Sequence, residues 1–202
     1  RGRSQIDEGN AMTRVVQEFT TDVPVWKPYV TPVDLSKATP GQLKALQVTP
    51  SNRKVSDYVL VLAHDEETLT HRSPLFNAIM YDEGGMSRAE REIGALAASV
   101  VNRCIYCAAV HSARYVQLAK DPETVDKIFA AGADADLDHR LSAIMYFATR
   151  LAECPPTADA TDMIGLRRAG LDEEEILDLI LSSSLFGWAN RLMHTLGEPV
   201  TG

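Results

Sequence analysis

The stretch E-R-E-I-G-A-L-A-A-S-V-V-N-R-C-I-Y-C-A-A-V-H, residues 90–111, decides the fold of this chain. On a single α-helix, Cys104, Cys107 and His111 would share one face, because steps of three and seven residues return nearly to the same side. Glu92 does not fit that picture. Twelve residues of straight helix would place it roughly 18 Å from Cys104, beyond any hydrogen bond. The four groups can meet only if the chain reverses between them.

The sequence predicts that reversal at Asn102, because asparagine tolerates the left-handed backbone conformation that closes a helix. A second helix would then begin at Cys104. Glu92 and His111 would each lie roughly 13 to 15 Å below the turn, side by side on neighbouring helices. Cys107 would lie one turn above His111. We therefore expect a core helical hairpin that carries the C-x2-C motif.

Such a hairpin suits thiol chemistry. A free thiol is only a few per cent ionised at neutral pH, whereas a helix N-terminus and a nearby imidazole lower its pKa and favour the reactive thiolate. We expect His111 to take the proton of Cys107, and Glu92 to orient the imidazole. Cys104 could then resolve an oxidised Cys107 by forming a disulfide.

Two other hypotheses fit the same residues. Cys104, Cys107 and His111 could form three-quarters of a zinc site, with Glu92 as the fourth ligand. Alternatively, both cysteines could be inert, because cysteine packs like a small hydrophobic residue in a helical core.

Three further residues receive structural interpretations. We expect His194 to be a cap or surface residue, Cys154 to end a helix before two prolines, and Tyr106 to be a packing ring.

Helix signals occupy most of the chain and strand signals are scarce, so the fold class is predicted to be all-α. Residues 1–36, interrupted by prolines, read as an N-terminal arm that packs on a neighbouring subunit, and residues 37–202 as the helical domain. Ser87 and Glu90 have the spacing of a capping box, which predicts a helix from about Arg88. The other expected helices lie near residues 11–19, from 40, over 55–64, 74–81, 122–131, 137–153, 161–169 and 173–196.

Composition limits the function classes. The chain has 202 residues, 45% of them hydrophobic, which is enough for one substantial core. The formal charge of -8 would repel a phosphate backbone, so nucleic acid is not an expected partner. No apolar run reaches the roughly 18 to 20 residues that span a bilayer, and no secretory signal is visible. We expect a cytoplasmic protein without a membrane partner, and no cofactor.

The pattern E-x11-C-x2-C-x3-H, formed by Glu92, Cys104, Cys107 and His111, resembles the signature of AhpD-like alkylhydroperoxidases within the carboxymuconolactone decarboxylase superfamily. The surroundings A-L-A-A-S-V-V-N-R-C-I-Y-C-A-A-V-H-S and F-G-W-A-N-R-L-M-H-T-L-G-E-P resemble the core helix pair and the closing helix of its peroxidase-related branch. The likeness covers roughly residues 35–200. One departure is Tyr106, where the best-studied branch has a second histidine.

The resemblance implies an AhpD-like helical fold that assembles into homo-oligomers, and an oxidoreductase that reduces hydroperoxides with electrons from an external dithiol. Cys107 would attack the peroxide, Cys104 would resolve the product, and Glu92 with His111 would relay protons. Two alternatives stay open. One is a decarboxylase or lactone-processing enzyme of the same superfamily, and the other a non-enzymatic helical oligomer stapled by zinc or a disulfide.

Overall fold

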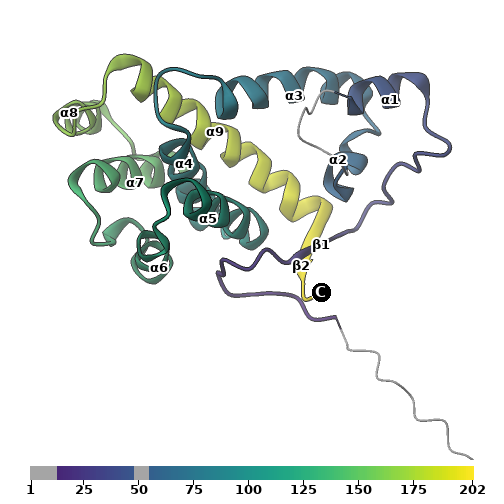
Figure 1. The fold of residues 1–202 in the computed structure, drawn as a ribbon, viewed down its shortest axis with the longest axis horizontal. Coiled ribbons are helices and arrows are strands. Elements are labelled where there is room, and N and C mark those ends of the chain that lie inside the picture. The colour runs from purple at the N-terminus through teal and green to yellow at the C-terminus, as the bar shows by residue number, and fades with distance from the viewer. Residues whose placement is uncertain (1–12, 48–54) are drawn as a thin grey trace, which may run out of the picture.

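A computed structural model describes residues 13–47 and 55–202 and shows a helical protein with one short antiparallel strand pair (Figure 1). The all-α prediction is confirmed. The α-helices are α1 (Pro40–Leu46), α2 (Asp57–Leu62), α3 (Glu66–Tyr81), α4 (Arg88–Val101), α5 (Ile105–Ala119), α6 (Pro122–Ala131), α7 (His139–Ala152), α8 (Ala160–Arg168) and α9 (Glu173–Leu196). A 3-10 turn, η1 (Gly132–Asp134), follows α6, and strand β1 (Val25–Pro28) pairs with β2 (Gly197–Val200). No helix within the described ranges is long and apolar enough to cross a lipid bilayer.

Helix α4 lies at the centre and packs against α5, α7 and α9 (Figure 1). Its residues from 91 to 99 are all buried, and many of them are small. Small side chains let the long helix α9 approach closely: a Cβ on Gly94 would lie 2.9 Å from Ser182 Oγ. Helix α4 is therefore the fixed element on which the rest of the domain is arranged.

Most helix starts agree with their capping signals. Ser87 and Glu90 form the expected capping box at α4, and Asp121 caps α6. The prediction for α3 was wrong at its start. We expected this helix to begin at Pro74, but it begins at Glu66, with Asp65 as its N-cap, and Pro74 lies inside it. Burial of Leu69 against the α1–α2 region stabilises the earlier turns despite the backbone donor that proline lacks.

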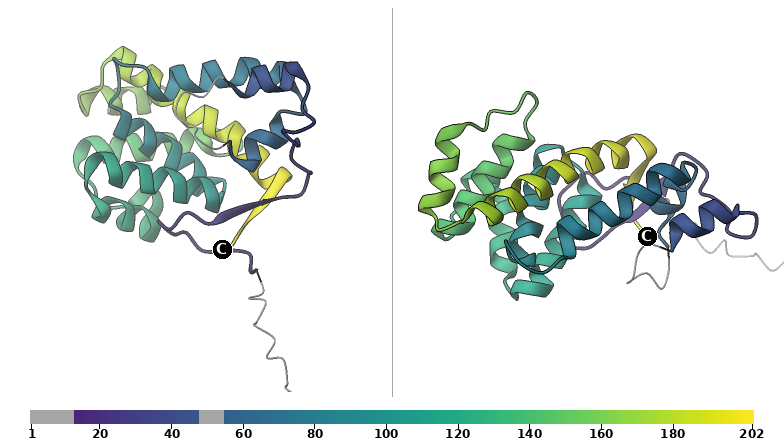
Figure 2. Two further views of the ribbon diagram at one scale, coloured as in Figure 1. Left: turned by 45° about the vertical axis from the view of Figure 1, so that its right-hand side comes forward. Right: turned by 90° about the horizontal axis from the view of Figure 1, so that it is seen from above.

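The N-terminal arm also differs from expectation. The helix predicted near 11–19 is wrong over residues 13–19, which are not helical, and residues 11 and 12 lie outside the described ranges. The arm instead pairs with the C-terminal strand of its own chain, and both figures show the purple arm beside that yellow strand (Figure 2). Val16 N–H donates to Pro199 O at 2.9 Å, and Thr201 N–H donates to Arg14 O at 2.8 Å. These partners are far apart in sequence, so the local pattern of apolar residues did not predict the strands.

The arm reaches the core through Trp26. This side chain is buried, its Nε1 donates to Met193 O at 3.3 Å, and it packs in one cluster with Cys104 and Cys107. The close approach of the two strands requires Gly197, because a Cβ there would lie 2.4 Å from a Trp26 ring carbon. Packing of the arm on a neighbouring subunit, and the division into 1–36 and 37–202, remain predictions.

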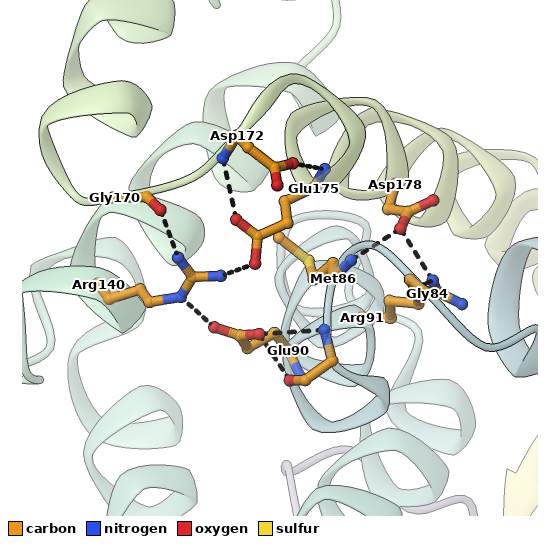
Figure 3. Close-up of polar contacts among 10 residues, drawn as sticks. Gly84, Met86, Glu90, Arg91, Arg140, Gly170, Asp172, Glu175 and Asp178 are labelled. Atoms are coloured by element: carbon orange, nitrogen blue, oxygen red, sulfur yellow. Dashed lines mark hydrogen bonds and ion pairs between the residues drawn. The ribbon is translucent and has the colours of Figure 1, made fainter.

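An ionic network joins α4, α7 and α9 at the end of the domain opposite the strands (Figure 3). Arg140 on α7 lies between two carboxylates, with Nε 2.5 Å from Glu90 Oε1 and Nη2 2.5 Å from Glu175 Oε1. Its Nη1 donates to the Gly170 carbonyl at 3.1 Å. All three nitrogens of this guanidinium have partners.

Arg91, the residue after Glu90 on α4, is also paired with a carboxylate, but its buried Nε has no hydrogen-bond partner (Figure 3). Its Nη2 lies 2.8 Å from Asp178 Oδ2 and 2.6 Å from the Gly84 carbonyl, and its Nη1 donates to Asp82 O at 2.9 Å. The loop between α3 and α4 is thereby fastened to α9.

Candidate active site

The chain reverses between α4 and α5, as the sequence predicts, but a different residue makes the turn. Asn102 keeps right-handed helical geometry (φ -79°), and Arg103 takes the left-handed conformation (φ 51°). The Asn102 carboxamide donates to Ala98 O at 2.9 Å, which holds this residue to the end of α4. The left-handed step therefore falls one residue later, and Cys104 N–H donates back to Ser99 O at 2.9 Å.

His194 fastens the reversal from outside. This exposed residue lies in the last turn of α9, and its Nε2 donates to the Asn102 carbonyl at 2.9 Å. Cys154 is exposed just after α7, as expected of a helix-end residue. Tyr106 is half-buried and borders both of the pockets described below.

The hairpin brings Glu92 and His111 into contact. Glu92 Oε2 lies 2.5 Å from His111 Nδ1, and both side chains are buried. The other carboxylate oxygen, Oε1, lies 2.5 Å from Arg88 Nη2. The Phe186 ring packs edge-on against the imidazole at 4.0 Å between centroids. The carboxylate thus fixes the imidazole by one nitrogen and leaves Nε2 free of that contact.

The two cysteines lie at the start of α5. Cys104 is its N-cap residue and Cys107 lies in its first turn, with 2.9 Å between the sulfurs, which are free thiols. Both residues are buried. Among residues 13–47 and 55–202, no hydrogen bond joins His111 to either sulfur. The sulfurs therefore contact each other, and the imidazole is hydrogen-bonded to neither of them.

Thiol acidity differs from the expectation that His111 would lower the pKa of Cys107. The hydrogen bond from the Cys107 thiol lowers the pKa of Cys104, and burial only partly offsets this effect. The same hydrogen bond raises the pKa of Cys107, and burial raises it further. A backbone N–H of Cys107 also lowers the pKa of Cys104, as expected at a helix N-terminus. These shifts favour the thiolate on Cys104, which then accepts a hydrogen bond from the Cys107 thiol.

The two sulfurs face different pockets. Cys107 borders a pocket of about 180 Å³ together with His111, Glu92 and side chains from α2, α3 and α9. Cys104 borders a second one, of about 300 Å³, which is walled by the arm, β2 and His194. One sulfur can therefore meet a small molecule while its partner is approached from another side.

Two residues near these sulfurs were missing from the sequence-based prediction. The Asn190 carboxamide, fully buried on α9, lies 3.2 Å from Ser99 Oγ and 3.3 Å from the Asn102 side chain. Its interaction with the sulfurs contributes to the lowered pKa of Cys104 and opposes in part the raised pKa of Cys107. Asn190 could have been predicted from the sequence, because it is a polar residue at a helical position that faces the core. Arg72 of α3 also borders the Cys107 pocket, and nothing in its sequence context marks it.

The zinc hypothesis finds no support in the arrangement of side chains. Within the described part of the chain, no three His, Cys, Asp or Glu side chains lie close enough together to hold a metal ion.

Comparison with known proteins identifies the family. The profile of the Carboxymuconolactone decarboxylase family matches residues 66–153, which include the whole α4–α5 hairpin. A solved structure from Ralstonia eutropha JMP134, described as an alkylhydroperoxidase AhpD core and an uncharacterized peroxidase-related protein, is 26% identical. The match covers 86% of this chain and 90% of that one, with a TM-score of 0.72. These matches support an AhpD-like member of the carboxymuconolactone decarboxylase superfamily. Its fold is AhpD-like.

Other structures show how widely this superfamily fold is shared. An uncharacterized peroxidase-related protein from Silicibacter sp. TM1040 is 26% identical over 86% of this chain and 94% of that chain, with a TM-score of 0.70. The debrominase Bmp8, solved as a variant in complex with 2,3,4-tribromopyrrole, is 18% identical over 84% of this chain and 89% of that chain, with a TM-score of 0.69. No curated protein matches the sequence. The resemblance seen in the sequence is confirmed for family and fold, and the choice of reaction rests on the site.

Proposed function

We propose that this protein is a thiol-dependent peroxidase that reduces hydroperoxides through Cys107 and Cys104. One observation carries the proposal: two free sulfurs lie 2.9 Å apart, and one of them borders a pocket that also holds a buried imidazole–carboxylate pair. Two solved structures that are 26% identical to this chain are described as peroxidase-related, which agrees with this chemistry.

The first half of the reaction uses the hydrogen-bonded sulfurs. The Cys104 thiolate takes the proton of Cys107, and the resulting Cys107 thiolate attacks the terminal oxygen of the hydroperoxide. The O–O bond breaks, Cys107 becomes a sulfenic acid, and the alkoxide takes a proton from the charged His111 imidazole. Glu92 holds the imidazole by Nδ1 and stabilises its charged form.

The second half closes the disulfide. The Cys104 sulfur attacks the Cys107 sulfur, the S–OH bond breaks, and the hydroxide that leaves takes up the proton that Cys104 releases and becomes water. One hydroperoxide and two thiols thus yield one alcohol, one water and one disulfide. An external dithiol restores both thiols by exchange, and the pocket bordered by Cys104 offers it a separate approach.

Thiol titration and hydroperoxide consumption test the proposal. One equivalent of cumene hydroperoxide should remove two thiols from the wild type, and a dithiol should restore them. Cys107→Ser should abolish turnover, whereas Cys154→Ser, which alters an exposed thiol outside the site, should leave it unchanged. Turnover retained in Cys107→Ser would contradict the proposal.

Trapping assigns the two roles. After one equivalent of hydroperoxide, Cys104→Ser should carry a sulfenic acid on Cys107, detectable by dimedone labelling and mass spectrometry. A label on Cys104 in the Cys107→Ser variant would reverse the assignment.

Alkylation at graded pH tests thiol acidity. Because its pKa is lowered, Cys104 should react with iodoacetamide at a pH where an ordinary thiol is still protonated, and Cys107 should not. Earlier labelling of Cys107 would instead favour activation by His111.

The alternatives predict other results. A decarboxylase or lactone-processing enzyme would keep its activity without the cysteine pair, and a stapled helical oligomer would consume no peroxide. The debrominase relative shares only the fold at 18% identity, so tribromopyrrole serves as a comparison substrate. Assembly into homo-oligomers belongs to the proposal and is measured by light scattering.

A further inference from the structure

Two arginines in the Cys107 pocket have buried donors without partners. Arg72 of α3 forms no ion pair within the described residues, and its Nε is buried without a hydrogen bond. The Arg88 guanidinium binds Glu92 through Nη2, but its Nη1 is likewise buried and unbonded. The Tyr58 hydroxyl lies beside Arg72 and interacts with it, but a neutral phenol does not balance the charge of the guanidinium. Buried donors without partners are costly, so two of them, Arg72 Nε and Arg88 Nη1, at one pocket favour a ligand there.

The charge of the pocket opposes that of the chain. Three arginines (Arg72, Arg88 and Arg114) border it, and Glu92 is its one carboxylate within the described ranges. The whole chain carries a formal charge of -8. Arg72 is half-buried. Burial lowers its pKa, and the interactions with Tyr58 and Tyr81 offset this only in part, so no group of the pocket balances the charge of Arg72. A negatively charged ligand group would supply it.

The rest of the pocket is apolar. The Arg72 guanidinium carbon lies 4.5 Å from the Phe76 ring centroid, and that of Arg88 lies 4.3 Å from the Tyr81 centroid. Phe186 and other apolar side chains complete the walls. The volume of about 180 Å³ is little more than the roughly 150 Å³ of a cavity that binds benzene. The pocket therefore suits one ring or a short chain.

We propose that this pocket binds a small substrate with an apolar body and a carboxylate, so that the hydroperoxide reduced here belongs to a carboxylic acid. The proposal rests on the proposed peroxidase function for its reactive end. The planar guanidinium of Arg72 binds the carboxylate through two parallel hydrogen bonds, assisted by Arg88 Nη1. The apolar body lies against Phe76 and Phe186, and the hydroperoxide points to Cys107.

Binding is tested first, with unreactive probes that do not depend on the peroxidase activity. Calorimetry compares 4-isopropylbenzoate with 4-isopropylbenzamide, which has the same shape but no charge. The benzoate should bind the reduced wild type at least about tenfold more tightly, as expected for hydrogen bonds to charged groups. Equal affinities, or benzoate binding no tighter than inorganic phosphate, would overturn the carboxylate site.

Variants locate the site. Arg72→Met should remove the preference for the benzoate. Arg72→Lys should keep part of this preference, because lysine has the positive charge but cannot form two parallel hydrogen bonds to a carboxylate. Arg168→Met is the matched control, since it removes the same charge from an exposed position on α8. A preference that survives in Arg72→Met would overturn the assignment, and circular dichroism checks that each variant is folded.

The reaction arm separates the two proposals. Cumene hydroperoxide and its 4-carboxy derivative are compared by kcat/KM, and the wild type should prefer the carboxylate at least about tenfold. If both are reduced equally and both probes bind equally, the carboxylate site fails while the peroxidase stands. If neither is reduced but the benzoate binds selectively, the peroxidase fails while the anion site stands.

Discussion

Two arginine sites in this molecule look alike in sequence and differ in structure. Arg140 of α7 lies near the start of α4 and bonds to Glu90, Glu175 and the Gly170 carbonyl. Every nitrogen of its guanidinium therefore has a partner (Figure 3). In the Cys107 pocket, Arg72 has aromatic rings beside it but no carboxylate within the described residues. Both are arginines on helices that pack into the same small domain.

The difference separates structural from functional cations. A charge that is fully paired within the chain stabilises the fold and leaves nothing for a ligand, whereas a buried charge with unbonded donors costs stability and persists where a ligand supplies the missing partner. Arg88 combines the two cases, because one of its nitrogens orients Glu92 and the other remains unbonded. In the network of Figure 3, carboxylates of the chain itself neutralise Arg91 and Arg140, although the Nε of Arg91 is unbonded. Arg72 has no such carboxylate within the described residues, so we assign the network to the fold and the pocket to the proposed substrate.

The largest effect is expected at the paired site. Arg140→Met leaves the partly buried Glu90 and Glu175 without their cation, and should lower the free energy of unfolding by about 3 kcal/mol. Chemical denaturation measures the change. Arg167→Met, which removes an arginine from an exposed ion pair with Glu173, is the control and should cost at most about 1 kcal/mol. Equal losses in the two variants would show that the network contributes no more than a surface pair.

A smaller effect should appear when acid is added. Burial raises the pKa of Glu90, but the hydrogen bonds from Arg140 and Ser87 outweigh burial and hold the pKa below its usual value. A carboxyl group whose pKa is lowered by folding stabilises the protein above its unfolded pKa of about 4.3, and this contribution is lost as the pH falls through the lower folded pKa. The stability gap between wild type and Arg140→Met should therefore narrow from pH 7 to pH 3. A gap that is constant over this range would mean that Arg140 acts by packing alone.

Much of the hairpin could be predicted because its determinants are local. The spacing of Glu92, Cys104, Cys107 and His111 required a reversal, and the reversal brought the carboxylate to the imidazole as expected. The residue in left-handed conformation could not be predicted, because hydrogen bonds from the Asn102 side chain and from His194 hold Asn102 in the helix.

The rest of the site depends on contacts distant in sequence. The sequence around Trp26 does not indicate that the arm pairs with β2 and packs beside the cysteines, because the residues of β2 lie at the other end of the chain. The sequence predicted activation of Cys107 by His111, because spacing alone does not reveal that the two sulfurs contact each other. Arg72 became visible only once α3 was seen to begin at Glu66 and to face the pocket.

The smallest change in stability is the most informative one. Arg72→Met keeps an aliphatic side chain beside Phe76 and removes a half-buried charge that has no carboxylate partner within the described residues. The free energy of unfolding should therefore stay within about 1 kcal/mol of the wild type. Adding 4-isopropylbenzoate should then raise the melting temperature of the wild type and leave that of the variant unchanged, because only a ligand bound to the folded state stabilises it. If Arg72→Met instead loses as much stability as Arg140→Met, Arg72 is a structural cation like Arg140, and the contrast between the two sites disappears.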